Sequence, residues 1–144
     1  MEQIHATCVS IDAAGVLIIG ESGSGKSDLA LRLIDSGADL VADDRVDLHA
    51  DRGGIVAMPP PALAGMFEVR GLGVFQMKYR AEVRLALAAE IVSADEVDRF
   101  PPPTFCHFLE RSIPLMRLDA FDSSAPAKVR FALAGIKGHI SLAP

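Results

Sequence analysis

Cysteine, clustered positive charge and long apolar runs are all scarce in this sequence of 144 residues. The two cysteines, Cys8 and Cys106, lack C-x-x-C spacing, which argues against a zinc site. Reduced thiols are expected, although two cysteines could also pair with each other. No run of Lys or Arg occurs and the formal net charge is −5, so a nucleic-acid-binding surface is not expected.

Membrane association is not expected either. The longest apolar stretch, Gly15–Gly20, is far too short to span a bilayer. The N-terminal residues lack the basic head and the long apolar run of a secretory signal. The sequence therefore predicts a cytoplasmic protein without a membrane partner.

Half of the residues are hydrophobic, which is enough for one core, and the length suits a single domain over residues 1–144. Short apolar or alternating runs predict strands, and turn residues between two of them predict a hairpin. The expected strands are Thr7–Ile11, Val16–Ile19, Leu40–Ala42, the hairpin of Asp47–Ala50 with Ile55–Met58, Met66–Val69, and a strand within Ala81–Val92. Pro101–Pro103 is expected to be a loop, because proline cannot join a ladder.

Only two segments carry helical signals. Apolar residues recur at helical spacing after Lys26, and Gly37 stands where a C-cap belongs. A second helix is predicted to begin at residue 125 or 126 and to end at Leu133, with Gly135 just past its end. Many strands with few helices predict an α/β fold with a mixed β-sheet.

The strongest motif is a glycine-rich segment that matches G-x-x-x-x-G-K-[ST]. It consists of Gly20, Glu21, Ser22, Gly23, Ser24, Gly25, Lys26 and Ser27. Glycines allow successive backbone N–H groups to wrap a phosphate, and the following helix points its positive dipole end at the same anion. Lys26 would bridge the β- and γ-phosphates, and the Ser27 hydroxyl would bind Mg²⁺. A ligand-free Gly/Ser turn is the alternative, but the preceding strand and following helix favour a phosphate-binding loop.

Two adjacent carboxylates, Asp43 and Asp44, follow the predicted strand Leu40–Ala42. A P-loop enzyme needs an acid there, either to hold the metal's water shell or to accept a proton from the attacking hydroxyl. Neighbouring residues of a strand point to opposite faces, so the two acids cannot play the same part. A solvated turn is the alternative reading.

Three further features accompany these two motifs. His5 lies fifteen residues before Gly20, Arg45-Val46-Asp47 follows the acidic pair, and the segment 67–74 reads Phe-Glu-Val-Arg-Gly-Leu-Gly-Val. Together, over about residues 4–77, they resemble the catalytic domain of the HPr kinase/phosphorylase family. The resemblance implies an ATP- and Mg²⁺-dependent protein-serine kinase that acts on HPr or a related phosphocarrier, with reverse phosphorolysis as a second possible direction.

The resemblance also assigns roles to individual residues. Asp44 resembles the family's base, which removes the seryl proton, and Asp43 would orient it, although the opposite assignment stays open. His5 would lie near the reacting phosphate, and Lys26 would neutralise phosphate charge. Ser27 and Glu68 would be the Mg²⁺ ligands. Arg70, Gly71 and Gly73 would form a loop against the phosphates.

The sequence also departs from the family pattern. The family's usual N-terminal domain is not expected, and the segment after Gln76 is shorter. The arginine-bearing stretch nearer the C-terminus is poorly matched, with Arg117 or Arg130 as candidate substitutes. The helix at 126–133 falls where the family places its partner-contacting helix. His49, His107 and His139 match nothing and are expected to be structural or exposed.

Two other functions compete with the protein kinase. A P-loop kinase of a small hydroxyl metabolite usually needs a lid of arginines, and the arginines here form no such cluster. A nucleotide-sensing module without turnover would not need a base. A GTPase is not expected, because no N-K-x-D segment occurs. The mean hydropathy of +0.30 predicts self-association, and the family resemblance favours a hexamer over a dimer or trimer.

Overall fold

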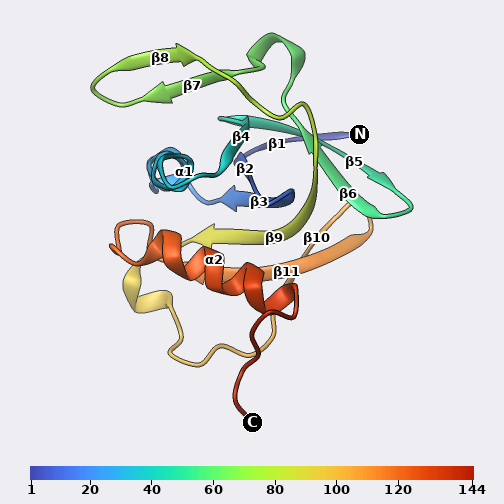
Figure 1. Ribbon diagram of the computed structural model, residues 1–144, viewed down its shortest axis with the longest axis vertical. Helices are drawn as coiled ribbons and strands as arrows, with labels where there is room; N and C mark the ends of the chain where they lie inside the picture. The colour runs from blue at the N-terminus through green and yellow to red at the C-terminus, as the bar shows by residue number, and fades with distance from the viewer.

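The computed structural model describes residues 1–144 as a mixed α/β structure (Figure 1). Two short 3₁₀ turns accompany the strands and the two α-helices, at Pro61–Leu63 and Ala94–Glu96. The elements are β1 (Glu2–His5), β2 (Thr7–Ile11), β3 (Ala14–Ile19), α1 (Lys26–Asp35), β4 (Asp39–Ala42), β5 (Arg45–Asp51), β6 (Gly54–Met58), β7 (Met66–Val69), β8 (Gly73–Gln76), β9 (Val83–Ile91), β10 (Phe105–Phe108), β11 (Arg111–Leu118) and α2 (Ala125–Ile136).

A nine-stranded mixed sheet organises the chain, in the order β1-β5-β6-β9-β3-β2-β4, with β11 beside β9 and β10 beside β11. β3, β9 and β11 run parallel, whereas β2 is antiparallel to both β3 and β4. The carboxyl ends of β3, β4, β9 and β11 therefore share one edge of the sheet. A separate two-stranded hairpin, β7–β8, lies outside this sheet.

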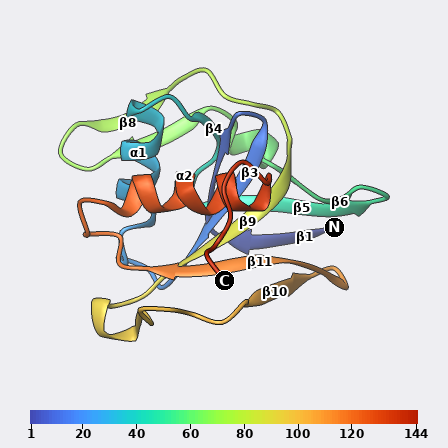
Figure 2. The ribbon, with the colours of Figure 1, turned by 60° about the horizontal axis from the view of Figure 1, so that its bottom comes forward.

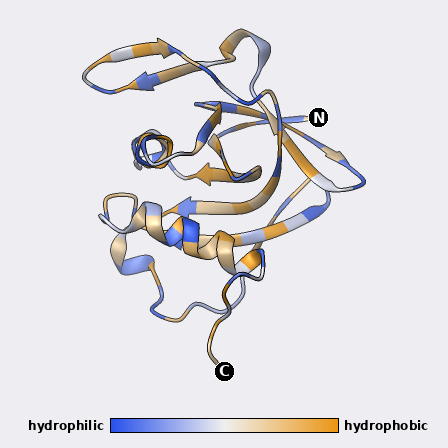
Figure 3. Ribbon diagram, viewed as in Figure 1, coloured by the Kyte–Doolittle hydropathy of each residue, from blue (hydrophilic) through white to orange (hydrophobic).

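Alternating side chains of the central strands build two cores. Val16 and Ile18 of β3 join the cluster that packs under α1 and α2, whereas Leu17 joins the cluster that faces β5 and β6. All three side chains are fully buried. In Figures 1 and 2, α1 and α2 accordingly lie on one side of the central strands, and β1, β5 and β6 lie on the other side. The hydrophobic colour of β2 and β3 in Figure 3 marks this doubly covered layer.

The two helix ends differ in how well they were predicted. Gly37, at φ 113°, follows α1, and the amide of Ala38 donates to the carbonyl of Leu33, so the predicted C-cap is confirmed. The prediction for α2 was wrong by one turn, because Gly135 lies inside the helix. The residue that adopts the left-handed conformation is Gly138 (φ 80°).

Most predicted strands are confirmed, including the β5–β6 hairpin, and Pro101–Pro103 lies outside every helix and strand. Four strands, β1, β8, β10 and β11, were not predicted. All of β8 is exposed, and every residue of β1 and β10 is exposed or half-buried, so their sequences lack the alternation of a half-buried strand. Cys8 and Cys106 are both free thiols. Neither helix is long and apolar enough to cross a membrane.

Candidate active site

The glycine-rich loop (the P-loop, Gly20–Ser27) runs from the end of β3 into the first two residues of α1. It lies at the edge of the sheet where the parallel strands end. Gly25 is the N-cap of α1, at φ 107°, and no side chain caps the helix. The amides of Gly23, Gly25, Lys26 and Ser27 donate no hydrogen bond within the chain. The loop lies between a strand and a helix as predicted, and unpaired donors at a helix N-terminus suit an anion.

The side chain of Lys26 folds back onto the first residues of this loop. Its Nζ donates to the carbonyl of Gly20 at 2.8 Å and to that of Glu21 at 2.9 Å. The Ser24 Oγ is buried and has no hydrogen-bond partner. A buried, unpartnered hydroxyl beside free amides fits an incoming phosphate oxygen, which would satisfy it.

Asp43 joins three separate elements, because its partners lie in α1, β2 and β7. Its Oδ1 accepts hydrogen bonds from Ser27 Oγ at 2.9 Å and from Thr7 Oγ1 at 3.2 Å, and its Oδ2 accepts from the amide of Glu68 at 3.3 Å. The residue is 8% exposed. Charge-assisted hydrogen bonds of this kind hold a carboxylate in one orientation, so Asp43 is positioned next to the serine of the loop.

Asp44 has the opposite character, because its side chain is 67% exposed. Its backbone φ is 69°, and the amide of Arg45 donates to the carbonyl of Asp43 at 2.8 Å, which closes a tight turn around Asp44. A positive φ is uncommon for a residue with a β-carbon, and such conformations cluster at functional sites. His5, at the end of β1, brings its Nδ1 to 3.7 Å from the Asp44 Oδ1.

The two acids do have different environments, but not through strand alternation, because β4 ends at Ala42 and the turn at Asp44 separates their side chains. Asp43 points inward to the P-loop serine, and Asp44 points to solvent beside His5. Thr7 was not identified from the sequence as part of this site. It lies two residues after His5 in β2, and only its burial at 1% exposure beside Asp43 marks it.

The β7–β8 hairpin carries the remaining predicted residues. Phe67 is buried against α1, and the neighbouring Glu68 is exposed, with its amide bonded to Asp43. Arg70 and Gly71 lie in the turn, and Gly73 begins β8. No hydrogen bond joins this turn to the P-loop. Figure 1 shows the hairpin projecting beyond α1 at the same side as the P-loop.

The loop between β11 and α2 borders the P-loop on its other side. Arg32 of α1 donates to the carbonyls of Ala120 and Asp122, which ties this loop to α1. Lys128, together with the amide and hydroxyl of Ser124, lowers the pKa of Asp122 to about 2. Arg32 of α1 and Lys128 of α2 therefore both hold this loop, which no sequence pattern indicated.

Neither candidate substitute arginine contacts the P-loop. Arg117 pairs with Glu90 at 2.7 Å, and Arg130 donates to the carbonyls of Leu33 and Ser36 at the far end of α1. Both side chains have structural partners where they stand.

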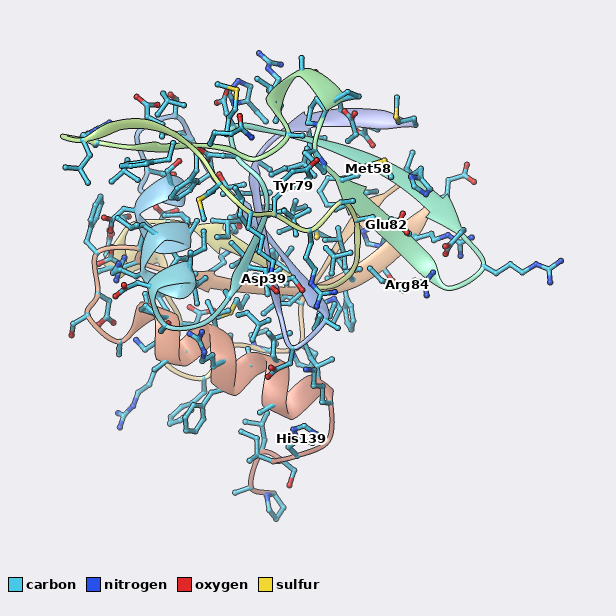
Figure 4. The ribbon with its side chains drawn as sticks, turned by 45° about the horizontal axis from the view of Figure 1, so that its top comes forward. Asp39, Met58, Tyr79, Glu82, Arg84 and His139 are labelled. Carbon is cyan, nitrogen blue, oxygen red and sulfur yellow. The ribbon has the colours of Figure 1, made fainter.

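The opposite edge of the sheet is also charged. Figure 4 labels Asp39, Glu82 and Arg84 there, where β4 and β9 begin. Arg84 pairs with Asp51 of the β5–β6 hairpin at 2.6 Å. His49 lies near this edge, whereas His107 and His139 are exposed. None of the three histidines approaches the P-loop residues through a hydrogen bond or ion pair.

No group of three His, Cys, Asp or Glu side chains converges as a preformed metal cage. The donor set at the P-loop is smaller and consists of oxygen atoms, with the Ser27 hydroxyl against the Asp43 carboxylate. Mg²⁺ in phosphoryl-transfer enzymes binds through one or two such protein oxygens together with phosphates and water. The residues present fit that ion.

Known proteins resemble this chain both in sequence and in fold. The family model described as the HPr Serine kinase C-terminal domain matches residues 1–89. The chain belongs to this family. It is 41% identical to the HPr kinase/phosphorylase of Bordetella petrii over 105 residues, 67% of this chain and 34% of that protein. It is also 45% identical to that of Clostridium tetani over 75 residues, 52% of this chain and 25% of that protein.

The chain thus spans about a quarter to a third of the length of these curated relatives. A solved structure, described as the Hpr(Ser) kinase/phosphatase from Coxiella burnetii, matches with a TM-score of 0.83 at 24% identity. The match covers 96% of this chain and 98% of that one. The HPr kinase fold therefore continues through β10, β11 and α2, past the residues that the family model matches.

Proposed function

We propose that this chain is the catalytic domain of an ATP- and Mg²⁺-dependent kinase that phosphorylates a serine of HPr or a related phosphocarrier. The observation that carries the proposal is the difference between the environments of Asp43 and Asp44. A buried carboxylate bonded to the P-loop serine lies next to an exposed carboxylate that is paired with a histidine. The relatives named HPr kinase/phosphorylase support the same assignment.

The P-loop residues would hold the triphosphate. The free amides of Gly23, Gly25, Lys26 and Ser27 and the Ser24 hydroxyl would donate to phosphate oxygens. Lys26 would exchange its two carbonyl contacts for the β- and γ-phosphates and offset their charge. Arg70, Gly71 and Gly73 are proposed to contact the phosphates from the β7–β8 turn.

Ser27 and Glu68 would bind Mg²⁺, with Asp43 supporting both. Asp43 already accepts hydrogen bonds from the Ser27 hydroxyl and from the backbone amide of Glu68, so one buried carboxylate orients the hydroxyl and holds the backbone that carries Glu68. The bound ion would neutralise charge that develops on the transferred phosphoryl group.

Asp44 would act as the general base. The seryl hydroxyl would give its proton to the Asp44 carboxylate as its oxygen bonds to the γ-phosphorus, and the bond from that phosphorus to the β-phosphate oxygen would break. His5 would hold the Asp44 carboxylate in position. In the phosphorolytic direction, Asp44 would return the proton.

Exposure favours a protein acceptor over a small metabolite. The side chains of His5 and Asp44 are 58% and 67% exposed, so the proposed base is open to a large partner. A small-molecule kinase would need to enclose its acceptor to exclude water. A sensor without turnover would gain nothing from an exposed base beside the P-loop.

The test is phosphorylation of the phosphocarrier from the same source by the purified chain, with labelled ATP and Mg²⁺. We expect acid-stable phosphate on one seryl residue of the carrier, and none on a carrier in which that serine is Ala. Label on a small metabolite with none on the carrier would favour the metabolite kinase. Binding of ATP without any transfer would favour the sensor.

We also propose that the chain is a homo-oligomer, with a hexamer preferred. Leu72, Val74 and Phe75 of the β7–β8 hairpin are 75%, 60% and 47% exposed, which is unusual for adjacent large apolar side chains. A second copy would cover them. Light scattering at micromolar concentration should therefore give a multiple of 15.3 kDa. A mass near 15.3 kDa with and without Mg²⁺-ATP would contradict this.

A further inference from the structure

The ring of Phe121 lies against the P-loop yet is largely open to solvent. A β-carbon built on Gly25 would come within 2.9 Å of the Ala120 Cβ and 3.3 Å of the Phe121 Cζ, so the loop and the ring are in contact. The residue is nevertheless 71% exposed. Nothing in the proposed phosphate chemistry uses this aromatic side chain.

We propose that Phe121 is the stacking platform for the base of the bound nucleotide, a proposal that rests on the function proposed above. The π-face of an exposed ring next to a triphosphate site suits a purine, which is flat, apolar on its faces and connected to the phosphates.

The order of the strands supports this position. Asp43 and Asp44 follow β4, which lies two places from β3 on one side of it. β9 and β11 lie on the other side of β3, and the loop that carries Phe121 follows β11. A triphosphate in the P-loop with its γ-phosphate toward Asp44 directs its opposite end, the nucleoside, toward the β9–β11 side. Figure 1 shows β9 and β11 ending near this loop, beside α1.

Hydrogen bonds also hold the backbone of Phe121 in place before any ligand binds. The amide of Phe121 donates to the Asp119 carboxylate at 3.0 Å, and the amide of Asp122 donates to the Asp119 carbonyl at 3.2 Å. Arg32 fixes the carbonyls on either side of Phe121 to α1. A backbone that is already ordered loses less conformational entropy when a ligand binds, which increases affinity.

Stacking recognises the plane of a base and not its edge. Removing the ring should therefore weaken ATP and GTP by similar factors, of about 5- to 100-fold each. Inorganic tripolyphosphate carries the same phosphates without a base, and its affinity should not change.

The experiment is calorimetric titration of the whole chain, in Mg²⁺ buffer, with ATP, GTP and tripolyphosphate. The variants are Phe121→Ala, Phe121→Tyr, which keeps the ring and should bind as the wild type does, and Phe131→Ala. Phe131 is the matched control because it is 69% exposed on α2. Thermal unfolding of each variant reports whether the fold is retained.

A selective loss of ATP and GTP binding in Phe121→Ala, restored in Phe121→Tyr, supports the platform. Unchanged nucleotide affinity in Phe121→Ala overturns it. An equal loss of nucleotide and tripolyphosphate also overturns it, because the ring would then only support the Gly25 backbone. If the wild-type chain binds neither ATP nor tripolyphosphate, the proposed function itself fails. If it binds both equally, only the platform fails.

Discussion

Replacement of Lys26 by Ala should reduce the rate of phosphoryl transfer by at least about 10²–10³-fold and weaken Mg²⁺-ATP binding. The lysine Nζ lies against the P-loop, where its present partners are two carbonyl oxygens of the loop at 2.8 and 2.9 Å. These neutral partners can be exchanged for phosphate oxygens, whose charge strengthens the interaction. Steady-state kinetics and calorimetry would measure both effects.

Because Lys26 also bonds the P-loop carbonyls, a loss of activity needs a structural control. Lys137→Ala removes an exposed lysine at the end of α2 that forms no ion pair, and it should leave turnover unchanged. Thermal unfolding of Lys26→Ala should stay close to that of the wild type. Wild-type activity in Lys26→Ala would refute the P-loop assignment.

Asp44→Asn should lower kcat by about 10²–10⁴-fold while nucleotide affinity stays near that of the wild type. The amide keeps the size of the carboxylate but cannot accept the seryl proton at neutral pH. Asn is also among the residues that best tolerate a positive φ, so the turn at φ 69° should persist. Single-turnover kinetics with the carrier protein, alongside ATP titration, would separate chemistry from binding.

Asp12→Asn is the matched control, because Asp12 is also exposed at a positive φ (50°) but lies in the β2–β3 turn, at the opposite edge of the sheet. It should leave kcat unchanged. Asp43→Asn should behave differently from both, because an amide cannot accept from Ser27, Thr7 and the Glu68 amide together. It should weaken Mg²⁺-dependent binding as well as turnover. An Asp44→Asn variant with nearly full turnover would make Asp43 the next candidate base.

Local patterns predicted the parts of the site that depend on neighbouring residues in the chain. The P-loop could be predicted because its glycines, Lys26 and the start of α1 form one continuous segment. Strands β2, β3, β4 and β9 were predictable because each is buried and therefore apolar or alternating. The strands β8 and β10 pack against too little of the core to carry such a pattern, and Gly135 resembled a C-cap that Gly138 supplies.

The sequence by itself determined the fold class and the position of the glycine-rich loop between a strand and a helix, and it placed two adjacent acids after β4. It could not determine which acid turns inward. That choice depends on Thr7, Ser27 and Glu68, which are distant in sequence and meet at Asp43 only because β2, α1 and β7 pack together. The closeness of Phe121 to the P-loop has the same origin, since Arg32 of α1 reaches the β11–α2 loop about ninety residues later in the chain. Contacts of this kind arise from packing, and no spacing along the chain encodes them.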